Sequence, residues 1–293
     1  MAIEESKVQG SLIACVDSSG YLEPVIQHAI WWNSQISVSG IVVANVSDLR
    51  CFDQPVVNEL GGALGVQPFQ GLVAELQRIE SMRVETIRSR ATALMEASGG
   101  GIRWRFDNRM GVPADVIQPF QSCALGVVLG KRGDGYGYAS EHLGSNLDRI
   151  LRSSQLPCLI SSRQFRPLSS ILIAYDGSES IENGLRHFVA FRDIRSLAVR
   201  LIHVREGSGQ HSDEIAARMH AHVDALRAAG CLSVEADVMD GDVEDRVSDF
   251  VSRHDIGLLV LGARGRSRLR NLFVGSTTVE LVRRCRIPIL TFR

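Results

Sequence analysis

Several features that commonly assign a function are missing from this sequence. Its six cysteines include no C-x-x-C pair, so no zinc or thiol-exchange motif is visible, and a reducing cytoplasm is the simplest compartment. No apolar run approaches the roughly 18 residues of a membrane-spanning helix, and the acidic first residues are unlike a secretory signal. The formal net charge is −1, so no overall field attracts nucleic acid or an acidic membrane. We therefore expect neither as a partner.

Common catalytic motifs are missing as well. The sequence has no Walker loop, no G-x-G-x-x-G after a strand and no nucleophile elbow. His220 and His222 are two residues apart, a spacing that does not place both on one helical face. We expect no catalytic residue and no metal site.

What the sequence does contain is one internal repeat. Leu-Ile-Ala occurs at 12–14 and at 172–174, and each copy is soon followed by an aspartate, Asp17 or Asp176. Later in each copy an apolar run ends in a G-x-x-G motif and a Gly-Ser pair follows. The matching residues are Gly130, Gly133, Gly144 and Ser145 in the first copy and Gly262, Gly265, Gly275 and Ser276 in the second. A solenoid would show more copies, so the repeat indicates a duplicated domain.

The spacing of the repeat locates an insertion. Asp17 and Asp176 lie 159 positions apart, but Gly130 and Gly262 lie only 132 apart, so the first copy is about 27 residues longer. The extra residues fall near 48–75, a stretch rich in Gly, Pro and Gln that is typical of a long surface loop. We expect it to be a lid or plug at the first copy's cleft, or else a disordered loop. The predicted domains are 1–163 and 169–293, joined by a linker around 161–168.

In the second copy, segments with the apolar pattern of a strand alternate with segments in which apolar residues recur at helical spacing. Apolar runs or alternation predict strands, and apolar residues at helical spacing predict helices between them. The expected strands are 170–176, 198–204, 234–238, 256–261 and 287–292, and the expected helices are 179–192, 215–226, 243–251 and 276–285. This order predicts an α/β fold of two tandem doubly wound domains, each with a five-stranded parallel sheet flanked by helices. We also expect strands 156–160 and 287–292 to lie at sheet edges and to pair, within one chain or between two.

The glycine motif of the second copy is suited to phosphate. Glycine has no Cβ, so a backbone N–H can approach an anion closely, and the helix expected after Gly275 offers unpaired N–H groups. Ser276, Thr277 and Thr278 add hydroxyl groups. Arginines stand at 264, 266, 268 and 270, with no acidic residue from 262 to 275. The alternative is that no ligand is bound here. The glycines would then only permit tight turns, and the arginines would only form a solvent-exposed surface.

The pattern G-x2-G-x9-G-S after an apolar strand resembles the ATP-binding signature of the universal stress protein family, and residues 173–178 resemble that family's first strand and turn. The resemblance implies ATP, with or without Mg²⁺, as the ligand. It also implies that Asp176 and the backbone of Val204 contact adenine. The residues it implies for ribose and phosphates are Gly262, Arg264, Gly265, Gly275, Ser276, Thr277 and Thr278. Asp176 could instead serve only to cap the next helix.

The first copy departs from this pattern. Ten residues rather than nine separate Gly133 from Gly144, and Asp134 and Glu141 offset the charges of Lys131 and Arg132. Asp17, Gly130, Gly133, Gly144 and Ser145 still match. The first copy could therefore be a domain that binds no nucleotide, and we expect the second to bind ATP more tightly.

Three functions remain open at this point. The favoured one is a cytoplasmic ATP-binding stress or signalling protein with at most slow ATP hydrolysis, acting as a homodimer or an intramolecular pseudo-dimer. The second is an interaction scaffold with degenerate sites. The third is an enzyme of the adenine-nucleotide α-hydrolase-like class, which would need a further catalytic motif.

Overall fold

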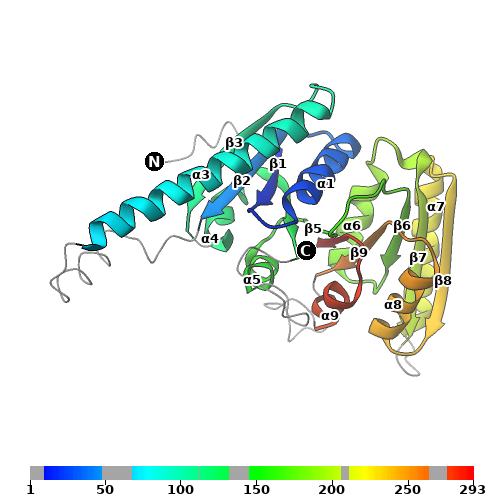
Figure 1. Cartoon of the computed structure of the whole chain (residues 1–293). Coiled ribbons are helices and arrows are strands. Elements are labelled where there is room, and N and C mark those ends of the chain that lie inside the picture. Colours follow the sequence, from blue (N-terminus) through cyan, green and yellow to red (C-terminus); the bar gives the residue numbers. More distant parts are fainter. Residues whose placement is uncertain (1–9, 48–67, 112, 132–144, 206–210, 264–275) are drawn as a thin grey trace.

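Figure 1 shows the computed structural model of the chain, in which two α/β halves lie side by side. The structure describes residues 10–47, 68–111, 113–131, 145–205, 211–263 and 276–293. The first half contains the strands β1 (Ser11–Val16), β2 (Gly40–Ser47), β3 (Trp104–Met110), β4 (Ala124–Gly130) and β5 (Cys158–Ser161). The second half contains β6 (Ser170–Ala174), β7 (Ala198–Arg205), β8 (Ser233–Asp240), β9 (Leu258–Gly262) and β10 (Ile289–Phe292).

Helices connect the strands in both halves. Those of the first half are α1 (Leu22–Gln35), α3 (Pro68–Ala97), α4 (Pro113–Ile117) and α5 (Ser145–Ser153), with a short 3₁₀ helix at Gln118–Phe120. Those of the second half are α6 (Glu179–Val189), α7 (His211–Ala228), α8 (Val243–Arg253) and α9 (Ser276–Arg284), with a 3₁₀ helix at Ile194–Ser196.

Within the described residues the strands form one ten-stranded sheet in the order β3-β2-β1-β4-β5-β10-β9-β6-β7-β8. All neighbours within each half are parallel. At the centre β5 and β10 pair antiparallel, with Ile160 opposite Ile289 and Cys158 opposite Thr291. The predicted fold class is confirmed, because each half is a doubly wound five-stranded parallel sheet. The predicted pairing of the two edge strands is also confirmed, and it occurs within one chain.

The sheet is covered on both faces. One apolar cluster packs α1, α3, α6 and α7 against one face, and a second packs α4, α5, α8 and α9 against the other. The central strands are therefore continuous apolar runs, as in β9, where Leu258 to Leu261 are all buried. Both clusters contain residues from both halves, so the halves share a continuous core.

Local sequence signals account for the elements of the second half. The expected strands and helices are present with ends shifted by up to four residues. Ser178 caps α6 as expected, because its side chain accepts a hydrogen bond from the backbone N–H of Ile181. Gly230, with φ +101°, follows α7 two residues after its last residue, which fits the left-handed conformation that ends many helices.

The first half differs from the expectation in one element. The structure begins α3 at Pro68 and continues it for 30 residues, so the end of the expected 48–75 insertion is helical. Proline is compatible with a first helical turn because its missing N–H needs no partner there. The counterpart α7 has 18 residues, so part of the first copy's extra length is added helix. Residues 48–67 lie outside the described part of the chain, and a lid or plug there stays a prediction.

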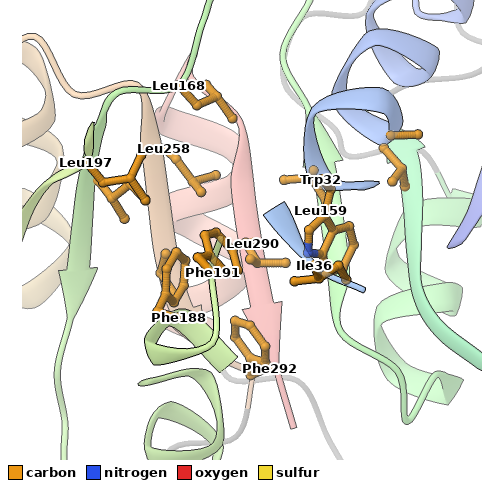
Figure 2. Packing of buried hydrophobic residues seen from close by; sticks show 14 of the residues in the cluster. Trp32, Ile36, Leu159, Leu168, Phe188, Phe191, Leu197, Leu258, Leu290 and Phe292 are labelled. Carbon is orange, nitrogen blue, oxygen red and sulfur yellow. The ribbon is translucent and has the colours of Figure 1, made fainter. Parts of the chain in front are cut away.

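An aromatic cluster joins the two halves beside the β5–β10 pair. Trp32 of α1 is completely buried, and its indole N–H donates to Nε2 of His187 on α6 at 3.1 Å. His187 in turn lies within 5.5 Å, centroid to centroid, of the rings of Phe191 and Phe292. Figure 2 shows Trp32 with Ile36 and Leu159 on one side, and Phe188, Phe191 and Phe292 near Leu290 on the other. This cluster ties α1 to α6 across the junction.

Two cations also cross the junction to helix ends. The Lys131 ammonium donates to the carbonyl oxygen of Cys285, directly after α9. The Arg293 guanidinium donates to the carbonyl oxygens of Leu151 and Arg152 in the last turn of α5, both at 2.6 Å. The last carbonyls of a helix lack intrahelical partners and carry partial negative charge, so cations are favourable there.

Two histidines make the stability of the protein depend on pH: His28 of α1, which is completely buried against Ser161, and His187 of α6, which is half-buried. Burial lowers the pKa of both His28 and His187 from 6.5 to about 4. Below pH 6.5 the unfolded chain therefore binds protons that the folded chain does not, so stability falls as the pH falls toward 4. Between about pH 7 and about pH 4.5, each histidine should lower the free energy of unfolding by about 2 kcal/mol. Urea unfolding at the two pH values measures the effect.

The variant His187→Gln isolates the contribution of His187 to the pH dependence of stability. Its amide oxygen can still accept from Trp32 but does not titrate, so its acid-induced loss of stability should be smaller than that of the wild type. His220→Gln, at an exposed position on α7, is the matched control and should behave like the wild type. An equal loss in His187→Gln and wild type would show that His187 does not contribute.

Candidate functional site

Three of the predicted residues meet at one edge of the second half. β6 lies between β9 and β7 in the sheet, and all three strands run parallel. Asp176 follows β6, Val204 lies near the end of β7, and Gly262 is the last residue of β9. Strand order reverses at this point, since the chain moves from β6 outward to β7 and β8 and then returns to β9 on the other side. Such a switch point is where doubly wound sheets bind ligands.

The turn after β6 is built by Asp176. Its Oδ1 accepts a hydrogen bond from the backbone N–H of Ser178 at 2.9 Å, and Gly177 between them has φ +70°, a conformation that favours glycine. The first half repeats this turn, since Oδ1 of Asp17 accepts from the N–H of Ser19 at 3.0 Å. Both aspartates thus hold the turn that leads into the next helix. In the second half, the helix cap itself is Ser178.

Gly262 has a packing role that needs no ligand. A Cβ at this position would lie 3.0 Å from Oγ of Ser178 and 3.3 Å from Cβ of Ser180, at the start of α6. The hydroxyl of Thr278 donates to the carbonyl oxygen of Gly262 at 3.1 Å, and Thr278 is buried. The structure therefore uses Thr278 to fasten α9 to the end of β9. Ser276 is exposed and Thr277 half-buried in the first turn of α9.

The remaining predicted residues of this motif, Arg264, Gly265 and Gly275, lie outside the described part of the chain. Their roles stay predictions.

The corresponding residues of the first half are placed in the same way. Asp17 follows β1 and Gly130 ends β4, which neighbours β1 in the sheet. A Cβ on Gly130 would lie 2.7 Å from Cβ of Tyr21, so this glycine also leaves room for the start of a helix. Ser145 opens α5, while Gly133 and Gly144 lie outside the described residues. Lys131, within the first glycine motif, is directed at Cys285 in the other half.

An ionic cluster that no sequence motif indicated lies beside the Asp176 turn. Glu182 of α6 accepts a hydrogen bond from the Tyr175 hydroxyl at 2.6 Å and from Arg218 of α7. Its other oxygen lies 2.7 Å from Nε2 of His222. Burial alone would raise the pKa of Glu182, but the hydrogen bonds from Tyr175 and Arg218 and the nearby His222 lower it below its ordinary value. Burial and the bond to Glu182 raise the pKa of Tyr175, which therefore stays neutral as a donor.

Metal ligands and membrane spans can be assessed over the described ranges. These contain no group of three or more His, Cys, Asp or Glu side chains that could hold a metal ion. They also contain no helix long and apolar enough to cross a membrane.

The fold and the three strand ends define a doubly wound α/β protein whose strand order reverses beside β6, the position at which such sheets bind ligands. Residues 168–293, which contain these three strand ends, match the model of the universal stress protein family. Over 97% of its length the chain is 27% identical to a universal stress protein of Synechocystis sp., of which 99% is covered.

Solved structures of low identity share the fold. A universal stress protein from Archaeoglobus fulgidus DSM 4304 matches with a TM-score of 0.66 at 17% identity, over 98% of this chain and 97% of that chain. A functionally unknown protein from Pseudomonas aeruginosa PAO1 matches with a TM-score of 0.56 at 14% identity, over 98% and 93%. The fold of the whole chain is therefore that of these proteins.

The two strand-end glycines yield a prediction about stability without ligand. Gly130→Ala should lower the free energy of unfolding by about 1–3 kcal/mol, because its Cβ would overlap Tyr21. Gly262→Ala should cost less, because its closest contact, Oγ of Ser178 at 3.0 Å, is less severe than the 2.7 Å contact at Gly130, and the remaining cost is a weakened cap of α6. Chemical denaturation of nucleotide-free protein measures both.

Gly101→Ala provides the control, since no atom lies within 4 Å of a Cβ built there, and it should leave stability nearly unchanged. If Gly130→Ala were as stable as the wild type, the packing explanation for this glycine would be wrong.

Proposed function

We propose that this chain is a tandem universal stress protein, a cytoplasmic stress-response or signalling protein whose second half binds ATP. The supporting observation is the meeting of Asp176, Val204 and Gly262 at the switch point, inside the stretch that matches the family. The two halves form an intramolecular pseudo-dimer through β5 and β10.

The residues present suit an adenine nucleotide. Asp176 and the backbone of Val204 would flank the base, as the family resemblance implies. Gly262 and the first turn of α9 would face the ribose and phosphates, where unpaired N–H groups favour anions. Arg264, Gly265 and Gly275 would complete the phosphate site. Any Mg²⁺ would be held mainly by the phosphates, because the described residues offer no cluster of metal ligands.

Bound ATP would act as a switch more than as a substrate. Its phosphates would hold the arginine-rich segment 264–270 in one position, giving partners a surface that depends on the nucleotide. Asp176, the carboxylate of the motif, is expected on the side of the base and is engaged with the backbone N–H of Ser178. Hydrolysis is therefore expected to be slow.

The first half is better suited to a structural role. Lys131 of its glycine motif binds the end of α9, and its acidic residues Asp134 and Glu141 oppose phosphate binding. This observation favours the scaffold alternative for the first half alone. An enzyme of the adenine-nucleotide α-hydrolase-like class has no comparable support.

A matched pair of glycine variants tests the assignment. Gly275→Val should remove most ATP binding, because a branched side chain would block close approach of the phosphates. Gly144→Val, at the corresponding position of the first half, should leave the main binding event intact. Isothermal titration calorimetry measures both, and mass spectrometry of ligand released from purified wild-type protein identifies the nucleotide.

If Gly275→Val bound ATP as tightly as the wild type, the site would lie elsewhere. If the wild type neither carried nor bound an adenine nucleotide, the scaffold alternative would replace this proposal for the whole chain.

A further inference from the structure

The Arg218 side chain is fixed beside the turn that carries Asp176. Its Nη2 donates to Oε1 of Glu182, and a Cβ built on Gly177 would lie 3.5 Å from its Nη1. The guanidinium is therefore held between α6 and the turn after β6. Its side chain is nevertheless 46% exposed, whereas that of Glu182 is 21% exposed. One part of the group is anchored and another part is accessible to a ligand.

The anchor is more than a surface ion pair. Glu182 also accepts from Tyr175, a residue only 2% exposed, at 2.6 Å, and lies 2.7 Å from His222. These contacts fix the carboxylate, and the carboxylate fixes Arg218. An isolated exposed ion pair has little energetic value and holds its side chains loosely, whereas a planar guanidinium held in one orientation can stack on an aromatic ring.

The order of the strands decides which part of a nucleotide Arg218 would meet. β9 and the helix after it, where phosphates are expected, lie on one side of β6, and β7 lies on the other. Arg218 belongs to α7, which follows β7 along the chain. It is thus on the side of Asp176 and Val204, where the base is expected, and away from the phosphates.

We propose that Arg218 is a specificity-determining residue of the second-half site, whose guanidinium stacks on the base of the bound adenine nucleotide. This inference rests on the proposed function, since it concerns the same site. The interaction is a cation–π contact, for which Arg is better suited than Lys because its charge is spread over a plane.

The full-length protein is titrated with ATP and, separately, with inorganic tripolyphosphate, which has the phosphates but no base. Arg218→Ala should weaken ATP binding by about 3- to 30-fold and change the affinity for tripolyphosphate by less than about 2-fold. Arg218→Lys keeps the charge without the plane, so it should show most of the same loss for ATP. Urea unfolding of each variant checks that the fold is retained.

The first half supplies a matched control. Arg83 of α3 lies beside the corresponding turn, with Nη1 donating to Oγ of Ser18 at 3.4 Å, and it pairs with Glu80. Arg83→Ala therefore removes an arginine from an equivalent setting, and ATP binding by the second half should stay unchanged.

The outcomes separate this inference from the function on which it rests. A wild-type protein that binds no ATP would overturn both. A wild type that binds ATP, with Arg218→Ala equal to it, would overturn the role of Arg218 and leave the function standing. Equal losses for ATP and tripolyphosphate, or full recovery of ATP affinity in Arg218→Lys, would show that the residue acts through its charge, and would also overturn stacking on the base.

Discussion

The antiparallel pairing of β5 with β10 is the interaction on which the rest of the molecule depends. Without it, each half would expose an apolar edge strand whose backbone groups are unpaired. Proteins avoid such exposed edges because they pair with other chains. With it, residues 158–160 and 289–291 complete each other's hydrogen bonds, and the hydroxyl of Thr291 donates to the carbonyl of Cys158 at 3.3 Å. The result is one sheet with a shared core on each face. The Trp32–His187 contact is possible only because this pairing brings α1 and α6 together.

The same junction makes the two halves unequal. Each half has a helix that begins at a Gly-Ser pair, and each of these helices ends at a cation from the other half. In one case that cation is Lys131, which belongs to the first half's own glycine motif. A positive charge that the sequence places near the first half's candidate site thus stabilises the second half. The second half is the half that retains the motif's spacing, and its arginine-rich segment 264–270 lies outside the described residues.

Residues at the candidate site also have structural roles that need no ligand. Asp176 shapes its turn, Gly262 leaves room for the start of α6, and Thr278 ties α9 to β9. In the first half, Asp17 likewise shapes its turn and Gly130 likewise leaves room for the start of a helix. Strand-end glycines and first-strand aspartates would therefore persist in a half that binds nothing. Their presence alone therefore does not indicate a ligand. What distinguishes the second half is the spacing and the hydroxyls of its motif, its charges and its family match.

The sequence by itself determined the order of the elements in the second half, the duplication and the pairing of two edge strands. These follow from local periodicity and from the physical cost of an open apolar edge. It could not decide whether the pairing is within one chain or between two, because the same backbone hydrogen bonds would form in either case. It also gave no sign that Lys131 would reach Cys285, or that Glu182 would hold Arg218, 36 positions away. Such contacts depend on how the helices pack on the sheet, which periodicity along the chain does not specify, so only the tertiary structure decided them.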